Sequence, residues 1–153
     1  SKVSVFEMKM IIERIEDVFG QMTLFLMAIA GVSLLVAGIS ILNIMLMSTI
    51  ERTKEIGLMR AIGAYRETIL KIFLTEALIL GLIGSIIGGA LSFVGGYAID
   101  MLILGTAKYV FQLSSLLYVF VGIGFGIATA LVSALYPAWK ASRLEPIQAL
   151  RYE

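Results

Sequence analysis

Three long runs of the sequence contain no Asp, Glu, Lys or Arg, and they constrain the fold more than any other feature. The runs are Val18–Ile50, Ala77–Ile99 and Tyr109–Trp139, of 33, 23 and 31 residues. A bilayer core about 30 Å thick requires about 20 apolar residues in a helix. Each run is long enough, and helices of a soluble bundle would need polar faces that these runs lack. We therefore predict an all-α membrane protein with three transmembrane helices.

The composition excludes several classes of chemistry. The chain is 59% hydrophobic and 15% charged, whereas about 25% charged residues is usual for a soluble domain. The absence of Cys excludes disulfides and thiolate metal sites, and the absence of His excludes histidine acid–base catalysis and HExxH zinc chemistry. The sequence also contains no GxxxxGK[ST] phosphate-binding motif. We expect no catalytic residue, metal site or cofactor in this chain, and a net charge of +1 argues against nucleic acid as a partner.

The distribution of basic residues predicts how the spans are oriented. The connector Glu51–Glu76 holds five basic residues, the tail Lys140–Glu153 holds three, and the loop Asp100–Lys108 holds one. Basic residues favour the cytoplasmic side of a membrane. We predict a multi-pass protein of the cell membrane, with connector and C-terminus in the cytoplasm and the loop and N-terminus outside. The N-terminal segment carries three basic residues of its own, so the prediction depends on the other regions.

The first uncharged run is longer than a single span requires. Its 33 residues make a helix of about 50 Å, well beyond the hydrocarbon core. Apolar residues continue upstream at alternating spacings of four and three, which is a heptad seam. The seam residues are Met8, Ile12, Ile15, Phe19, Met22 and Leu26. We predict one continuous helix, with residues 1–22 as an extracytoplasmic stalk and a span at about 23–48, although an amphipathic helix lying on the membrane is the alternative.

The second and third spans, at about 77–99 and 116–139, are rich in small residues at four-residue spacing. Such rows allow helix backbones to approach closely in lipid. The predicted packing positions are Gly84, Gly88, Gly122, Gly126 and Ala130. The partner helix is either in the same chain or in a second copy. We expect Tyr136-Pro137 to end the third span, and a short helix to restart near Pro146 in the tail 140–153.

The connector between the first two spans has a more specific pattern. Residues 51–66 combine helix-forming charged residues with an apolar patch of Ile56, Met59 and Ile62, and Gly63 is suited to end the helix. This pattern predicts a cytoplasmic docking helix. A solvated turn at the membrane surface is the alternative interpretation. Near this segment, Glu76 either pairs with Lys140 or Arg143 or marks the start of the second span.

Four stretches resemble one known family. ERTKEIGLMRAIGA, at residues 51–64, resembles the cytoplasmic signature of MacB/FtsX/LolC-type ABC transporter permeases, with the MacB branch the better match. LLVAGISILNIMLMS resembles the preceding span, FLTEALILGLIGSIIGG the following span, and YPAWKASRLEPIQALRYE the C-terminal end. The resemblance covers roughly residues 20–153.

The resemblance implies an organisation that goes beyond this chain. Such permeases have four spans, with a large extracytoplasmic domain between the first two, so we expect this chain to be the C-terminal part. They form homodimers or heterodimers in the lipid bilayer and pair with a P-loop ATPase subunit or domain, which binds ATP and Mg²⁺. Contact with a periplasmic or extracellular partner is also expected. By similarity, the ATPase-coupling residues are Glu51, Arg52, Glu55, Ile56, Gly57, Met59, Arg60, Ile62, Gly63 and Ala64.

Three functions are compatible with these features. The first is a permease that transmits the motion of the ATPase to an extracytoplasmic domain, for export of a drug, peptide, toxin or lipoprotein. The second is an FtsX-like transmembrane regulator of cell-wall hydrolases, which would use the same coupling helix. The third is an oligomeric channel, which predicts polar residues along one face of a span. We favour the first.

Overall fold

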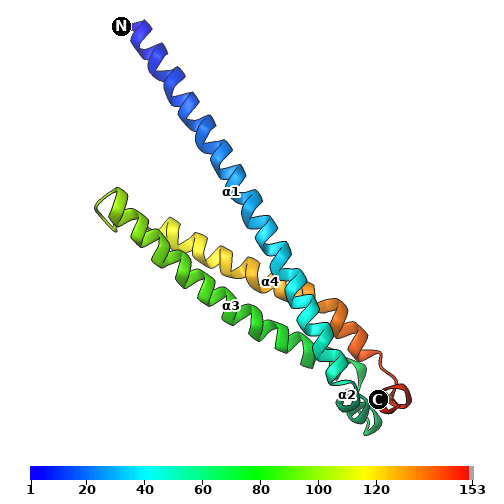
Figure 1. Ribbon diagram of the computed structural model, residues 1–153. Coiled ribbons are helices and arrows are strands. Elements are labelled where there is room, and N and C mark those ends of the chain that lie inside the picture. The colour runs from blue at the N-terminus through cyan, green and yellow to red at the C-terminus, as the bar shows by residue number, and fades with distance from the viewer. Residues whose placement is uncertain (152–153) are drawn as a thin grey trace. The chain divides into compact units, whose positions relative to one another are not determined.

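The computed structural model describes residues 1–151, in which there are five helices and no strand (Figure 1). The helices are α1 (Lys2–Glu51), α2 (Thr53–Ala61), α3 (Arg66–Ile103), α4 (Leu113–Ser142) and α5 (Pro146–Leu150). The helices α1, α3 and α4 are long and apolar enough to cross a membrane. The predicted fold class is therefore confirmed. The last two residues of the predicted tail, Tyr152 and Glu153, lie outside the described residues.

The chain divides into two parts, residues 1–36 and the remainder. The first part is entirely helical from Lys2 onward, as the continuous helix predicted for the stalk and first span requires. The six seam residues are all at least half exposed. The surface that the seam packs against, and the boundary between stalk and span, stay predictions.

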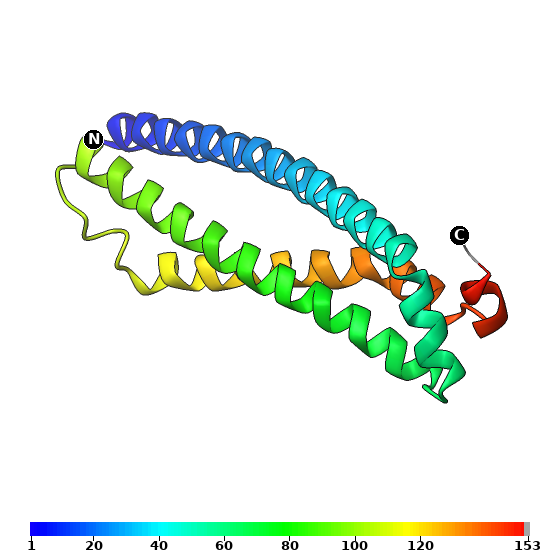
Figure 2. The same ribbon diagram turned by 60° about the horizontal axis from the view of Figure 1, so that its bottom comes forward.

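In the second part, α3 and α4 lie side by side along most of their length (Figures 1 and 2). The α3 face that contacts α4 repeats every four residues. Its members are Ile69, Phe73, Ala77, Gly81, Ser85 and Gly89. This spacing keeps one narrow stripe of α3 against its neighbour, because side chains four residues apart lie on the same helix face.

The helices α3 and α4 approach each other closely at Gly81. A Cβ atom at this position would lie 2.7 Å from the Cβ of Ala130 and 3.3 Å from the Cα of Ile127. One turn further on, Gly126 of α4 leaves room for the side chain of Ser85. Close approach of this kind increases van der Waals contact between helices, which is a main source of helix association in lipid. Gly126 and Ala130, two of the predicted packing positions, lie at this contact.

At the other three predicted packing glycines, the space that a side chain would enter is open. Atoms added at Gly84, Gly88 and Gly122 would meet nothing within 4 Å. Gly84 and Gly88 each come one residue before a member of the stripe, Ser85 and Gly89, and are therefore rotated from it by about 100°. The described residues fill none of this space, and packing of these glycines against a second copy stays a prediction.

The helix that contains the third predicted span continues beyond Tyr136-Pro137. Pro137 lies inside α4, which continues to Ser142. Proline removes one helical hydrogen bond at this point. Around it, however, Ala134, Ala138 and Ala141 are fully buried in the core of the second part. The packing of this alanine face maintains the helix across Pro137, so the prediction that Tyr136-Pro137 ends the helix is wrong.

The second part of the chain has two distinct ends. The short helices α2 and α5 lie at one end of the α3–α4 pair, and the loop of residues 104–112 lies at the other (Figure 2). The inner half of α1 also packs on α4, since Ser133 Oγ lies 2.8 Å from the position of a Cβ at Gly38. The predicted connector and tail thus meet at one end of the spans.

We predict that Gly81→Leu will lower the melting temperature of the purified chain in detergent. The larger side chain cannot be accommodated against Ala130, and overpacking of this kind typically costs about 1–3 kcal/mol. Gly84→Leu is the matched control, because a side chain there enters open space. Equal melting temperatures for the two variants would contradict the assignment of the α3–α4 contact.

We also predict the side of the membrane on which each end lies. In a chain without native Cys, Lys54→Cys and Gln148→Cys should react with an impermeant maleimide from one side only, and Thr106→Cys only from the other. All three positions are exposed, whereas the neighbouring Thr53 and Ser142 are buried and would label poorly. Labelling of Lys54→Cys and Thr106→Cys from the same side would rule out the three-span topology.

Candidate functional site

The transition from α1 to α2 takes place at a single residue. Arg52 has φ −102° and ψ 15°, but its N–H still donates to the carbonyl of Ser48, and the N–H of Ile56 donates to the carbonyl of Arg52, each at 3.0 Å. The buried hydroxyls of Thr49 and Thr53 donate to carbonyls in the preceding turn, at 2.8 to 3.0 Å. Such back-bonding satisfies a buried hydroxyl and tends to bend a helix. The local sequence thus redirects the chain without breaking its hydrogen bonding.

The side chain of Arg52 connects α2 and α3 at this transition. Its Nη1 donates to Glu76 Oε1 of α3 at 2.5 Å, and its Nε donates to Glu55 Oε2 of α2 at 3.3 Å. The guanidinium also lies 5.5 Å from the centre of the Phe73 ring, within the range of a cation–π contact. The hydrogen bond with Glu76, followed by that with Glu55, raises the pKa of Arg52 above its ordinary value.

The partner of Glu76 is neither of the two bases suggested for it by the sequence. The expected bases Lys140 and Arg143 are on α4 and just beyond it, and the guanidinium of Arg143 lies 4.9 Å from the ring centre of Trp139. Glu76 instead pairs with Arg52. Arg52 was expected to contact the ATPase. The 24 positions between Arg52 and Glu76 span two helices and a turn, so no local pattern indicated that they would pair.

The helix α2 is anchored in the core of the spans. Ile56 is fully buried in a cluster with Met45 of α1, Phe73 of α3 and Ala138 of α4, and Met59 packs against the same cluster. Ile56 was predicted to face a partner. Other residues of this chain cover its side chain completely, so Ile56 is not part of an exposed docking face. Truncating a buried Ile typically costs 2–5 kcal/mol, so this anchor is strong.

The exposed apolar face of α2 and its following turn consists of Leu58, Ile62 and Tyr65. Leu58 is 57% exposed and Ile62 is 80% exposed, and they lie one helical turn apart. Gly63 follows with φ 104° and reverses the chain, as predicted for the end of this helix. Of the predicted apolar patch, Ile62 is exposed, Ile56 is buried and Met59 is half-buried. Leu58, which was not predicted, is exposed beside Ile62.

Beside this face lies an open cavity of about 490 Å³ lined by Arg60, Tyr65, Arg66 and Glu67. Arg60 donates through Nη1 to the carbonyl of Ala64 at 3.1 Å. Its Nε is buried and has no hydrogen-bond partner among residues 1–151. Two arginines at one cavity favour a carboxylate or phosphate as the group received there.

The short helix α5 packs directly on α2. Ala149 is fully buried, and its Cβ lies 2.5 Å from the position that a Cβ would take at Gly57. By similarity, Gly57 was expected among the ATPase-coupling residues. It allows the close approach of α5 instead.

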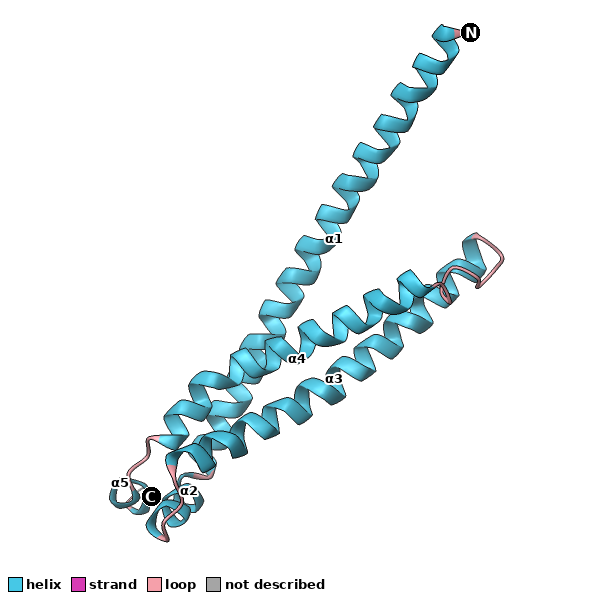
Figure 3. Ribbon diagram, turned by 180° about the vertical axis from the view of Figure 1, so that it is seen from behind, coloured by secondary structure: helices cyan, strands magenta, loops and turns pink. Residues whose placement is uncertain are grey.

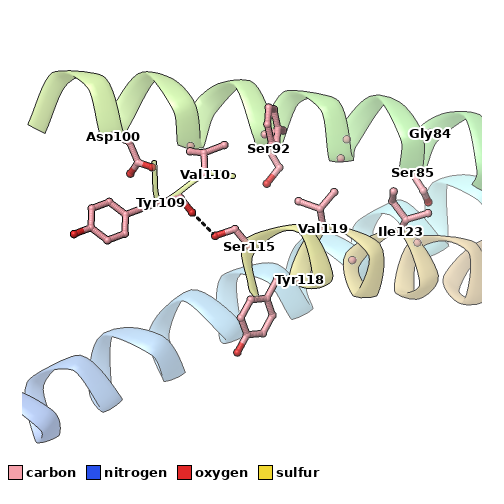
Figure 4. A pocket seen from close by; sticks show the side chains of 16 residues that line it. Gly84, Ser85, Ser92, Asp100, Tyr109, Val110, Ser115, Tyr118, Val119 and Ile123 are labelled. Carbon is pink, nitrogen blue, oxygen red and sulfur yellow. Dashed lines mark hydrogen bonds between the residues drawn. The ribbon is translucent and has the colours of Figure 1, made fainter. Parts of the chain in front are cut away.

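A second cavity, an open groove of about 630 Å³, lies between α3 and α4 towards the loop of residues 104–112 (Figure 4). Three of the predicted packing glycines, Gly84, Gly88 and Gly122, line it. Asp100 and Ser115 lie near its loop end, where Ser115 Oγ donates to the carbonyl of Tyr109 at 2.9 Å.

Comparisons with known proteins agree with this architecture. The family described as FtsX-like permease C-terminal matches residues 27–146. The macrolide export ATP-binding/permease protein MacB of Bdellovibrio bacteriovorus is 43% identical over 98% of this chain, and that of Syntrophobacter fumaroxidans is 41% identical over 98%. The uncharacterized ABC transporter permease YknZ of Bacillus subtilis is 41% identical over 97%. The chain spans 22%, 20% and 36% of the length of these relatives.

We predict that the Arg52–Glu76 pair couples energetically in a double-mutant cycle. Arg52→Glu places like charges beside Glu55 and Glu76, so it should lower stability, and the exchanged pair Arg52→Glu with Glu76→Arg should recover part of the loss. The two side chains are 31% and 37% exposed, so solvent screens the pair and a coupling of only about 1 kcal/mol is expected. The measurement is thermal unfolding in detergent, with Lys54→Glu as the exposed control. Strict additivity of the two changes would contradict the assigned pair.

Proposed function

Because this chain belongs to the FtsX-like permease family of ABC transporters, we propose that it transmits motion from an ATP-binding partner across the membrane. The observation that carries this proposal is the anchoring of α2. Ile56 lies in the same core as residues of α1, α3 and α4, and Arg52 bonds to both α2 and α3. A force applied to α2 would therefore be passed to all three spans, because a packed core does not deform continuously.

The orientation follows from the charge distribution. Basic residues gather at the end that holds α2 and α5, and this end would be cytoplasmic with the N-terminal segment outside. ATP and Mg²⁺ would be bound by the partner, either a separate subunit or another domain of the same protein. The seam from Met8 to Leu26 would form a stalk that packs in a dimer of permeases and reaches an extracytoplasmic partner.

Export is the direction we propose for transport. The relatives with names of known function are a macrolide exporter and, in Pseudomonas fluorescens, a pyoverdine exporter that is 42% identical over 86% of this chain. These names favour export of a small molecule over regulation of a cell-wall hydrolase. The described spans carry few polar groups, so the motion of an outer domain, and not passage along these helices, would move the substrate.

The docking face for the ATP-binding partner would be Leu58, Ile62 and Tyr65. These side chains suit an apolar groove, as in helix-in-groove recognition. A partner carboxylate would be received by Arg60 and Arg66 in the neighbouring cavity, and would add orientation and discrimination more than affinity.

We predict that Ile62→Asp will insert and fold normally but weaken binding of the ATP-binding partner. Loss of a central apolar contact typically costs about 2 kcal/mol or more, which is about thirtyfold in affinity. The measurement is the partner's affinity for the intact protein in nanodiscs, together with its ATP turnover. Thr106→Asp adds the same charge at the opposite end and serves as the control. If Ile62→Asp bound the partner with wild-type affinity and supported wild-type ATP turnover, α2 would not be the helix that couples this chain to the partner.

A further inference from the structure

The helix α5 is held against α2 by a contact without intervening side chains. Ala149 is fully buried, and the absence of a side chain at Gly57 is what allows its close approach. Figure 3 shows α2 and α5 side by side at the same end of the α3–α4 pair. Any partner that reaches α2 from this end therefore also meets α5.

The outer face of α5 is apolar. Successive residues of a helix are rotated by about 100°, so Ile147 lies nearly opposite Ala149, and Leu150 lies about 60° from Ile147. Ile147 is 68% exposed and Leu150 is 53% exposed. Ala149 fixes α5 on α2, while these two larger side chains are left uncovered.

The charges around this end indicate the chemistry of what covers it. Residues 51–67 and 140–151 together hold seven basic and four acidic residues. Arg143 precedes α5 and Arg151 follows it. A protein surface with an apolar depression and an acidic rim complements this arrangement.

We propose that α5 is a second docking element for the ATP-binding partner, with Ile147 and Leu150 inserting into an apolar depression beside the one that receives α2. The inference rests on the proposed function of α2 and extends its contact surface to the C-terminal segment. The direct contact of α5 with α2, which carries Leu58, favours the same protein partner over the lipid surface. Membrane binding by an amphipathic helix scales with buried apolar area, and this five-residue helix offers only two large side chains.

The test is the labelling rate of single cysteines in the full-length protein, reconstituted in nanodiscs. Ile147→Cys should react with a water-soluble maleimide about tenfold more slowly once the ATP-binding partner is assembled, as expected for a position enclosed by an interface. Leu58→Cys reports on the α2 contact in the same samples. Thr106→Cys, at the other end, should react at an unchanged rate.

The two labelled positions distinguish the role of α5 from the function proposed for α2. Protection of both Leu58→Cys and Ile147→Cys by the partner supports the inference. Protection of Leu58→Cys alone overturns the role of α5 and leaves the function of α2 intact, whereas protection of neither overturns both. Slow labelling of Ile147→Cys without the partner would mean that lipid covers α5, which also overturns the inference.

A variant with a charge provides the second measurement. Ile147→Asp should weaken binding of the ATP-binding partner about tenfold, and Gln148→Asp, which adds the same charge to a neighbouring exposed position of α5, should change it little. Equal affinities for the two variants would overturn the assignment of the outer face.

Discussion

The close contact of α3 and α4 at Gly81 is the constraint on which the rest of the structure depends. In lipid, apolar helices gain little from the hydrophobic effect, so their association requires close backbone approach and good van der Waals contact. Gly81 against Ala130, and Gly126 beside Ser85, supply that approach. The alanine face of α4 then continues from Ala134 to Ala141 and provides a small, even surface on which α1, α2 and α3 converge.

Packing, and not charge, connects α2 to the spans. The Arg52–Glu76 pair is partly exposed, and such pairs contribute at most about 1 kcal/mol. The burial of Ile56 contributes more, since truncating a buried Ile costs 2–5 kcal/mol. The ion pair instead fixes the orientation of α2, because one guanidinium bonds to α2 and α3 simultaneously and lies over Phe73. Two different interactions therefore set how firmly and at what angle α2 is held.

The sequence predicted the long helices and their order because runs without charge are unambiguous, and it predicted the reversal at Gly63 because a positive φ favours glycine. It did not predict which small residues meet. Gly81 and Gly84 both lie in four-residue rows, and the choice between rows depends on how α3 is rotated towards α4, which is a tertiary property. Pro137 was misjudged for the same reason, since the buried alanines around it outweigh one lost hydrogen bond.

The same limit applies to the two faces of α2. Ile56 and Ile62 are equally apolar, and periodicity alone places both in one patch. The structure separates them because the core takes Ile56 and leaves Ile62 in solvent with Leu58. A helix that couples two bodies, as we propose for α2, needs an apolar face towards each of them. The nine residues of α2 meet this need with Ile56 and Met59 on the inner side and Leu58 on the outer side, and Ile62 continues the outer side at the start of the turn. Because apolar residues lie on both sides of α2, the helix as a whole is only weakly amphipathic, although one side faces the core and the other is exposed.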